Sequence, residues 1–341
     1  MPSSETYQQL KSQRLIVDSC PYARFDSLAS EEDLNLLFNV LSDYKDMKGR
    51  HPVITANTVM TNPDFEKIRD SGFSEYHYEL FTETLKKYPS HHNSFDLWKQ
   101  GMDDGLFFPQ FHGREHVNIQ AWMKALKNIH SKYRAAFNDN VTWLGPKQNE
   151  NDHISVRASY DTDNVSDFEQ QKKVLAEGLS LFRMVFGYDS ESFIANNFIY
   201  HPELNTTLYE HGVRYIQGMK YQALPYLGKD KREMIRHYQG EFAEPGLYHL
   251  IRNCVFEPAQ HTETHDNVGY CLKGIKNAFF WRKPAIITTH RLNFIGYIDS
   301  KQRDKNLNQL RELIQVILNK WPDAEFMTST ELGKLIRNSN H

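Results

Sequence analysis

The chain has 341 residues, of which 40% are hydrophobic, 13% aromatic and 24% charged. This composition excludes a collagen-like, low-complexity or wholly disordered protein, because enough apolar surface is present to offset the ordering of the backbone. Forty basic and 43 acidic side chains leave a formal charge of −3. That balance excludes the basic surface that recruits nucleic acid or an anionic membrane, so we expect a globular protein with no nucleic-acid partner.

The three cysteines, Cys20, Cys254 and Cys271, cannot form an even disulfide framework and show no C-x-x-C spacing. We expect plain thiols in a reducing compartment, with Cys254 and Cys271 acting as buried small side chains. No apolar run approaches the roughly 18 residues that span a bilayer. The first residues also lack the basic and then apolar order of a secretory signal. The sequence therefore predicts a soluble, cytoplasmic protein with no membrane span.

Along the chain, short apolar runs alternate with longer amphipathic stretches. Leu34, Leu37, Phe38 and Leu41 fall at the spacing of a helix with one buried face, and acidic residues precede them. Further helices are expected at 117–129, 169–186, 203–212, 266–281, 303–320 and 330–337. Strands are expected at 53–57, 106–111, 154–158, 192–195, 214–217, 253–256, 285–289 and 325–328. The stretch 218–250 fits this alternation poorly, and we predict a lid or an inserted helix there.

Strands that alternate with helices over the whole length predict an α/β protein with a parallel sheet covered by helices. Eight strand-like runs without an obvious linker favour one domain, residues 1–341, in the form of a closed or nearly closed barrel. In such a barrel the loops after the strands converge at one end, where chemistry takes place. Polar residues in these loops are therefore our candidates for substrate binding: Asn57, Arg114, Asn196, Asn197, Glu257 and Asn293.

His112 and His116 stand four residues apart where a predicted strand gives way to a helix. If the helix has begun, this spacing places both rings on one side, about 5–6 Å apart at Cβ. Neutral imidazoles at that separation suit a divalent ion, with zinc as the first choice and cobalt or nickel as alternatives. Two surface histidines that cap a helix are an equally open interpretation. His261 and His265 repeat the spacing, but they follow a proline-containing loop and are expected to form a polar loop near the mouth.

His290 follows an apolar run that is typical of a buried strand. A histidine at the mouth of such a strand can act as a general acid when a carboxylate or a metal tunes its pKa. A hydrogen-bonded core histidine is the alternative. Asp103 and Asp104 precede the strand 106–111 and are expected at the opposite end of the barrel, which excludes them as catalytic groups. No P-loop, G-x-G-x-x-G or G-x-S-x-G motif occurs.

These residues lie in segments that resemble the polysaccharide deacetylases with a NodB-type barrel, the carbohydrate esterase family four superfamily. The resemblance covers most of the chain and rests on 21–33 (PYARFDSLASEED), 49–65 (GRHPVITANTVMTNPDF), 109–118 (PQFHGREHVN), 193–197, 256–258 and 284–296 (PAIITTHRLNFIG). It implies a distorted (β/α)7 barrel and a divalent metal held at His112 and His116. It also implies a general acid at His290 and an acetylated glycan as substrate.

The chain departs from the family pattern in two places. The region of Asn196 and Asn197 replaces the family's Arg-x-Pro motif, so the role of that motif is in doubt. The family's first strand carries two aspartates, a metal ligand and a general base, ahead of a stretch that here begins at Pro2. The resemblance therefore implies that the first strand and both aspartates are missing, which leaves two strand edges unpaired. Asp18 is a possible substitute, although it follows the helix.

Two functions follow from different classes. In the first, the protein is a hydrolase acting on C–N bonds other than peptide bonds, or on O-acetyl esters, and removes acetyl groups from a glycan. In the second, it is a catalytically inactive relative that binds a glycan or a partner protein in the same cleft. The first requires that His112, His116 and His290 face one common cavity. The sequence does not predict the oligomeric state of the protein.

Overall fold

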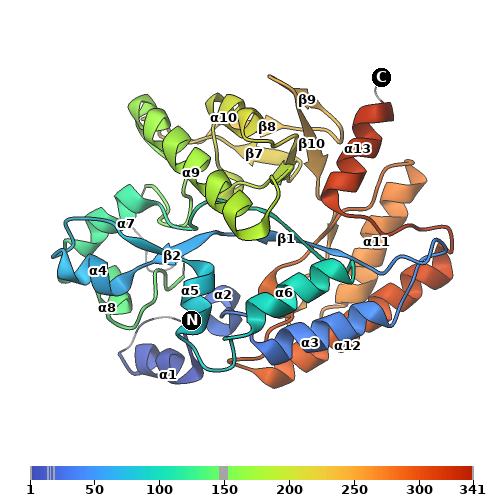
Figure 1. Cartoon of the computed structure of the whole chain (residues 1–341), viewed down its shortest axis with the longest axis horizontal. Helices are drawn as coiled ribbons and strands as arrows, with labels where there is room; N and C mark the ends of the chain where they lie inside the picture. Colours follow the sequence, from blue (N-terminus) through green and yellow to red (C-terminus); the bar gives the residue numbers. More distant parts are fainter. Residues whose placement is uncertain (1, 14, 16, 18–19, 146–152, 340–341) are drawn as a thin grey trace.

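The computed structural model describes residues 2–339 except 14, 16, 18, 19 and 146–152. Its centre is a sheet in the order β1-β4-β5-β6-β10-β9 (Figure 1). The first five strands run parallel, and β9 pairs antiparallel with β10. These strands are β1 (Ile54–Thr58), β4 (Phe107–Phe111), β5 (Ser192–Phe193), β6 (Tyr215–Gly218), β9 (Phe242–Ala243) and β10 (Leu247–Ile251).

Three further strand pairs lie outside this sheet. Strands β11 (Cys254–Val255) and β12 (Ile287–Thr288) pair in parallel. Two antiparallel pairs are β2 (Thr61–Pro63) with β3 (Tyr78–Leu80), and β7 (Tyr221–Ala223) with β8 (Met234–Arg236). The predicted mixed α/β architecture with a mostly parallel sheet is confirmed. The closed barrel is not, because in the described part of the chain the ladder is interrupted between β10 and β11, and β12 pairs with β11 alone.

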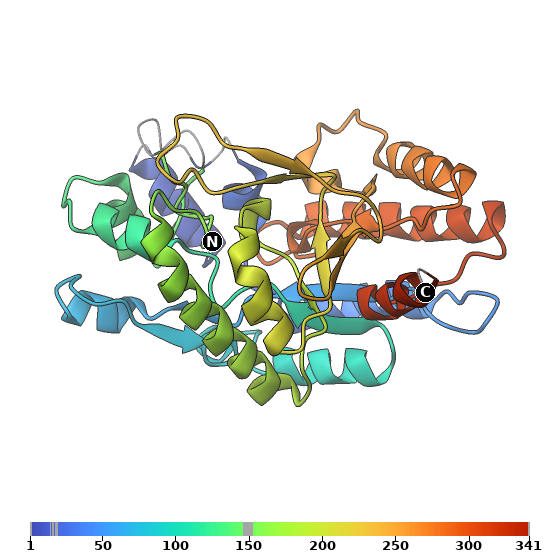
Figure 2. The same cartoon turned by 90° about the horizontal axis from the view of Figure 1, so that it is seen from above.

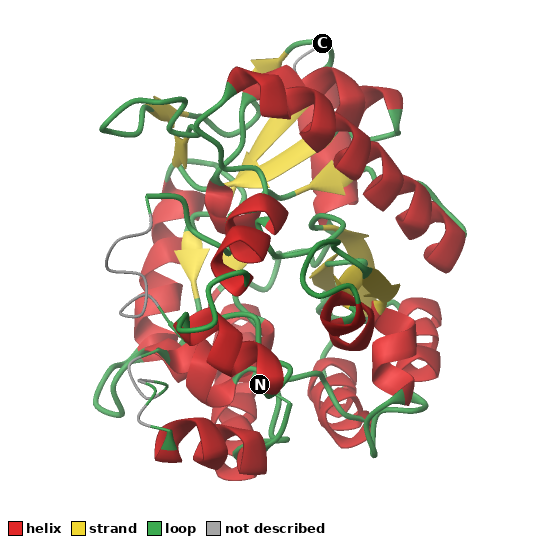
Figure 3. Ribbon diagram, turned by 90° about the vertical axis from the view of Figure 1, so that its left-hand side faces the viewer, coloured by secondary structure: helices red, strands yellow, loops and turns green. Residues whose placement is uncertain are grey.

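The helices flank the central strands on both sides (Figure 3). At the end coloured orange to red in Figure 2, α11 and α12 pack together, and α12 also contacts α3. The helices are α1 (Ser4–Ser12), α2 (Pro21–Phe25), α3 (Glu31–Ser42), α4 (Phe65–Asp70), α5 (Phe81–Lys86), α6 (Ser94–Asp103), α7 (Ile119–Leu126), α8 (Lys132–Asn138), α9 (Phe168–Phe186), α10 (Asn205–Glu210), α11 (Asn267–Phe280), α12 (Ser300–Lys320) and α13 (Ser329–Ser339). No helix among them is long and apolar enough to span a bilayer.

Two apolar clusters hold the helices to the strands. The predicted stripe of α3, including Leu34, Leu37 and Leu41, is buried against α11 and α12. Phe111 of β4 packs in a second cluster with α9. Gly178 allows the close approach of α9, because a Cβ atom there would lie 2.7 Å from the Phe111 ring. Core packing therefore places the carboxyl end of β4 directly beside α9.

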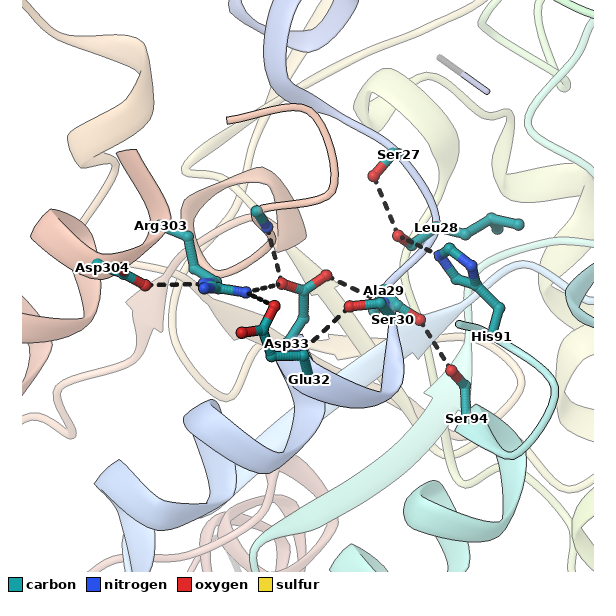
Figure 4. Close-up of polar contacts among 11 residues, drawn as sticks. Ser27, Leu28, Ala29, Ser30, Glu32, Asp33, His91, Ser94, Arg303 and Asp304 are labelled. Carbon is teal, nitrogen blue, oxygen red and sulfur yellow. Dashed lines mark hydrogen bonds and ion pairs between the residues drawn. The ribbon is translucent and has the colours of Figure 1, made fainter. Parts of the chain in front are cut away.

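A buried ion network joins the start of α3 to α12 (Figure 4). Asp33 is 1% exposed and forms a capping box with Ser30. Its Oδ1 atom accepts hydrogen bonds from the Arg303 Nη1 atom and the Gly296 N–H, each at 2.8 Å. Arg303 also bonds to Glu32 and Asp304. A single carboxylate thus caps one helix and binds a cation of another.

The predicted helices are present, with ends shifted by a few residues, and six of the predicted strands overlap an observed one. The strands predicted at 154–158 and 325–328 are wrong, because these segments form turns and irregular structure. Their backbone groups bond locally or to side chains: the Phe326 N–H donates to Asp46, and Ala158 N–H donates to the Ser155 carbonyl. The stretch 218–250 holds strands β7 to β10 in place of the predicted helix or lid.

Candidate functional site

A cavity of about 1730 Å³ extends along β1 and β12 and includes residues at the carboxyl ends of β1, β4, β10 and β12. His112, His116 and His290 all line it, as the hydrolase hypothesis requires. His112 directly follows β4, and its N–H donates to the carbonyl of Thr58, the last residue of β1, at 2.9 Å. Because β1 and β4 are parallel, their carboxyl ends open on the same side of the sheet.

The His112 and His116 rings meet edge to face, with centroids 5.2 Å apart. The Nδ1 atom of His112 lies 2.8 Å from the Ile194 carbonyl, so it carries the proton and Nε2 keeps its lone pair. Burial, together with smaller effects of the nearby Arg252, His290 and Arg157, lowers the pKa of His112 to about 4. Burial also lowers the pKa of His116 well below its ordinary value. Both imidazoles are therefore neutral at pH 7.

This pair fits two positions of a metal site. Neutral imidazoles are metal ligands, and the buried Nδ1 atom of His116 has no hydrogen-bond partner. A catalytic zinc ordinarily has three protein ligands. Among the described residues, no group of three or more His, Cys, Asp and Glu side chains could hold an ion. Asp18, the possible substitute ligand, lies outside the described residues.

His290 forms a histidine–carboxylate pair with Glu257. Its Nδ1 atom lies 2.5 Å from Glu257 Oε1. The other carboxylate oxygen accepts hydrogen bonds from Gln260 Nε2 and Asn293 Nδ2, both at 2.8 Å. Tyr22 meets the His290 ring edge to face at 5.3 Å. A fixed carboxylate orients the imidazole and stabilises its protonated form, which suits His290 for proton transfer to a ligand in the cavity.

The structure divides the predicted substrate-binding residues into two groups. Asn57 and Asn197 line the cavity, and Asn57 Oδ1 accepts a 3.0 Å hydrogen bond from Gln217. Asn196 and Asn293 are fully buried behind the lining. Asn196 Nδ2 donates to the His112 carbonyl at 2.9 Å. Asn196, Asn293 and Glu257 therefore act on the cavity through the histidines that they position.

Arg114 does not line the cavity, and its predicted contact with substrate is not supported. Its guanidinium lies over the Tyr78 ring at 4.7 Å and bonds to Glu115 and Glu177. Gly113, with φ of 117°, turns the backbone between His112 and Arg114. This turn directs Arg114 towards α9, although it stands between two cavity histidines in the sequence.

The sequence did not single out Arg157 and Arg252, and both line the cavity. Arg252 directly follows β10, so it fits the rule of polar residues at strand ends. It was missed because 218–250 was not read as strands. Arg157 lies between the rings of Tyr22 and Trp143, with its guanidinium carbon 4.9 Å and 4.4 Å from their centroids. No local sequence signal identifies Arg157, because its neighbours form turns.

The structure also places the three cysteines and the His261–His265 pair. The three cysteines are free and buried, as predicted. Burial raises the pKa of the Cys254 and Cys271 thiols to about 12, which leaves them protonated and unreactive at neutral pH. The His261 and His265 rings lie 4.2 Å apart, and His261 Nδ1 contacts Asn267 Oδ1 at 2.6 Å.

Comparisons with known proteins give only distant similarities. No family model and no curated protein matches the chain. A 4-α-glucanotransferase from Thermococcus litoralis aligns with 92% of this chain and 36% of its own, at 12% identity and a TM-score of 0.43. A candidate polysaccharide deacetylase from Mycobacterium smegmatis aligns with 98% of this chain and 85% of its own, at 12% identity and a TM-score of 0.44. A GH57 branching enzyme from Thermococcus kodakaraensis aligns with 97% and 64%, at 10% identity and 0.37.

The chain thus spans about a third of the length of the glucanotransferase and about two thirds of that of the branching enzyme. TM-scores below 0.5 do not establish a shared fold with any of the three. The function is therefore argued from the cavity.

Proposed function

We propose that the protein binds an acetylated glycan in the central cavity and removes an acetyl group by hydrolysis, as a polysaccharide deacetylase-like enzyme. The observation that carries the proposal is the His290–Glu257 pair, because both carboxylate oxygens are held and the imidazole lines the cavity. The cavity, at about 1730 Å³, exceeds the roughly 300–1,000 Å³ typical of sites for drug-sized ligands and extends well beyond the three histidines.

In this reaction His290 transfers the proton. Glu257 accepts a hydrogen bond from the Nδ1–H group of His290, which leaves Nε2 free to exchange a proton with the ligand. When His290 is protonated, the carboxylate stabilises the imidazolium that then protonates the departing amine or alcohol.

A divalent ion, zinc first and cobalt or nickel as alternatives, would be held by His112 and His116. When bound it would polarise the acetyl oxygen as a Lewis acid. The Ile194 carbonyl and Asn196 keep His112 in the orientation that leaves Nε2 unprotonated. The Ile194 carbonyl and Asn196 hold His112 in this way whether or not an ion is bound.

The test is acetate release from N-acetylated chito-oligosaccharides and O-acetylated xylan, with zinc, cobalt, nickel or a chelator. We expect His290→Ala to lower the rate about 10²- to 10⁴-fold, the usual worth of a positioned general acid. His130→Ala is the matched control, because His130 is exposed and lies outside the cavity lining. No acetate release with any metal, or equal rates for both variants, would contradict the hydrolase proposal.

A second candidate, a glycan-binding protein without catalysis, is favoured by one observation. The described part of the chain supplies two metal ligands where an active site ordinarily has three. Saturable binding of the same oligosaccharides without acetate release would support this candidate over the hydrolase.

A further inference from the structure

Two arginines face the cavity without a carboxylate partner. Arg252 is 9% exposed, and of the described residues none forms an ion pair or side-chain hydrogen bond with its guanidinium. The other two buried arginines, Arg114 and Arg303, are bonded to Glu115 and Asp33 respectively. Arg157 is held by two aromatic rings and likewise has no ion pair in the described structure. A buried cation without a partner is costly, so this arrangement needs a reason other than stability.

The charge on Arg252 persists at neutral pH. Burial lowers the pKa of its guanidinium to about 10, and Glu257 opposes that shift. At pH 7 the side chain is therefore still protonated. Protonated arginine keeps its full set of planar donors, and here none of them is used within the described structure.

The surrounding groups do not supply the missing negative charge. Glu257 acts electrostatically on Arg252, but its oxygens already bind His290, Gln260 and Asn293. His112 and His116 are neutral and bring none. The Asp26 carboxylate binds Arg291 at the surface. Among the described residues, no carboxylate is therefore bonded to Arg157 or Arg252, and a divalent ion bound nearby would add positive charge.

We propose that Arg157 and Arg252 bind an oxyanion of the ligand, a carboxylate or a phosphate, so that the cavity selects an acidic saccharide. The planar guanidinium matches the oxygens of either group and forms charge-assisted hydrogen bonds with them. The aromatic rings of Tyr22 and Trp143 hold Arg157 in place, which lowers the entropy lost when it binds. This inference rests on the proposed function only for the sugar part of the ligand.

Three saccharides that differ only at carbon 6 test the inference, and inorganic phosphate serves as a further probe. Glucuronic acid, glucose 6-phosphate and glucose are titrated into the full chain, and heat or ring-proton shifts report binding. We expect at least one acid to bind about ten times more tightly than glucose, with affinity falling as salt rises. A response to glucuronic acid alone assigns the carboxylate, and a response to glucose 6-phosphate alone assigns the phosphate. Inorganic phosphate that binds as tightly as glucose 6-phosphate assigns a free phosphate site and overturns the saccharide part.

Variants locate the binding. Arg157→Gln and Arg252→Gln should each weaken the acidic probe about 10- to 100-fold, the usual loss of a charge-assisted hydrogen bond. Arg183→Gln removes the same charge from an exposed position outside the cavity lining and should leave affinity within about twofold. Equal binding of glucose and the acids, or no effect of either cavity variant, overturns the proposal. Acid binding without acetate release keeps this inference and rejects the hydrolase, whereas acetate release without acid preference does the reverse.

Discussion

Arg303 and Arg252 are both buried cations, and their surroundings are opposite. Arg303, 3% exposed, binds Asp33 inside the network that joins α3 to α12. Arg252, 9% exposed, directly follows β10 beside the cavity and has no bonded carboxylate among the described residues. A cation neutralised by its own chain stabilises the fold, and a cation left without a partner is available to a ligand. The position of the carboxylates therefore separates a structural from a functional arginine.

The buried histidines differ from both arginines because they carry no charge at pH 7. His112 and His249 both have a pKa lowered to about 4, mainly by burial, and are neutral at pH 7. Arg303 is thus paired with a carboxylate, Arg252 has no bonded carboxylate among the described residues, and His112 and His249 are uncharged. The paired arginine, the arginine without a bonded carboxylate and the neutral histidines should each respond differently to mutation or pH.

The largest effect is expected at the paired arginine. Asp33→Ala removes the cap of α3 and leaves Arg303 without its buried partner, so the free energy of unfolding should fall by about 3–5 kcal/mol. Glu32→Ala is the control, because the Glu32 side chain is 71% exposed and should contribute only about 0–1 kcal/mol. Urea denaturation measures both variants. Equal losses would break the distinction between the buried and the exposed partner.

A smaller effect is expected when a neutral buried histidine is protonated. The His249 ring stacks 3.8 Å from His237, which contacts Gln222 and Glu241. Because the pKa is about 4 in the fold against an ordinary 6.5, the unfolded chain binds the proton first. Stability from this group is complete above pH 6.5 and is lost as the pH falls towards 4, by up to about 3 kcal/mol.

Urea midpoints at several pH values in this window check that dependence. The variant His249→Gln should lose part of the slope, whereas the exposed His130→Ala should keep it. An unchanged slope in His249→Gln would show that other groups, His112 and His116 among them, account for the acid sensitivity.

The smallest effect, and one of opposite sign, is expected at the unpaired arginine. Without ligand, Arg252→Met removes a buried charge that has no bonded partner, so the free energy of unfolding should stay constant or rise by about 1 kcal/mol. Arg303→Met under the same conditions should lower it, because the buried Asp33 carboxylate then loses its cationic partner. Thermal unfolding compares the two. A similar loss in both variants would remove the basis for treating the two arginines differently.

The site was predictable from the sequence only in part. His112, His116 and His290 follow strands and line one cavity, as their sequence positions predicted. Arg114 was expected beside them, but the turn at Gly113 directs it to Glu115 and Glu177. Glu257, predicted to bind substrate, is hydrogen-bonded to His290. A strand end predicts that a side chain is near the mouth, but not which way it points.

The sequence alone determined the α/β class, the helices and the positions of most strands, because apolar spacing and capping act within a few residues. It also determined that three histidines follow strands. Only the tertiary structure decided that no described sheet closes and that Arg157 lies between Tyr22 and Trp143. It alone decided that, among the described residues, no carboxylate is bonded to Arg252. These outcomes depend on contacts between segments far apart in the chain, and no local pattern records which charges such contacts bring together.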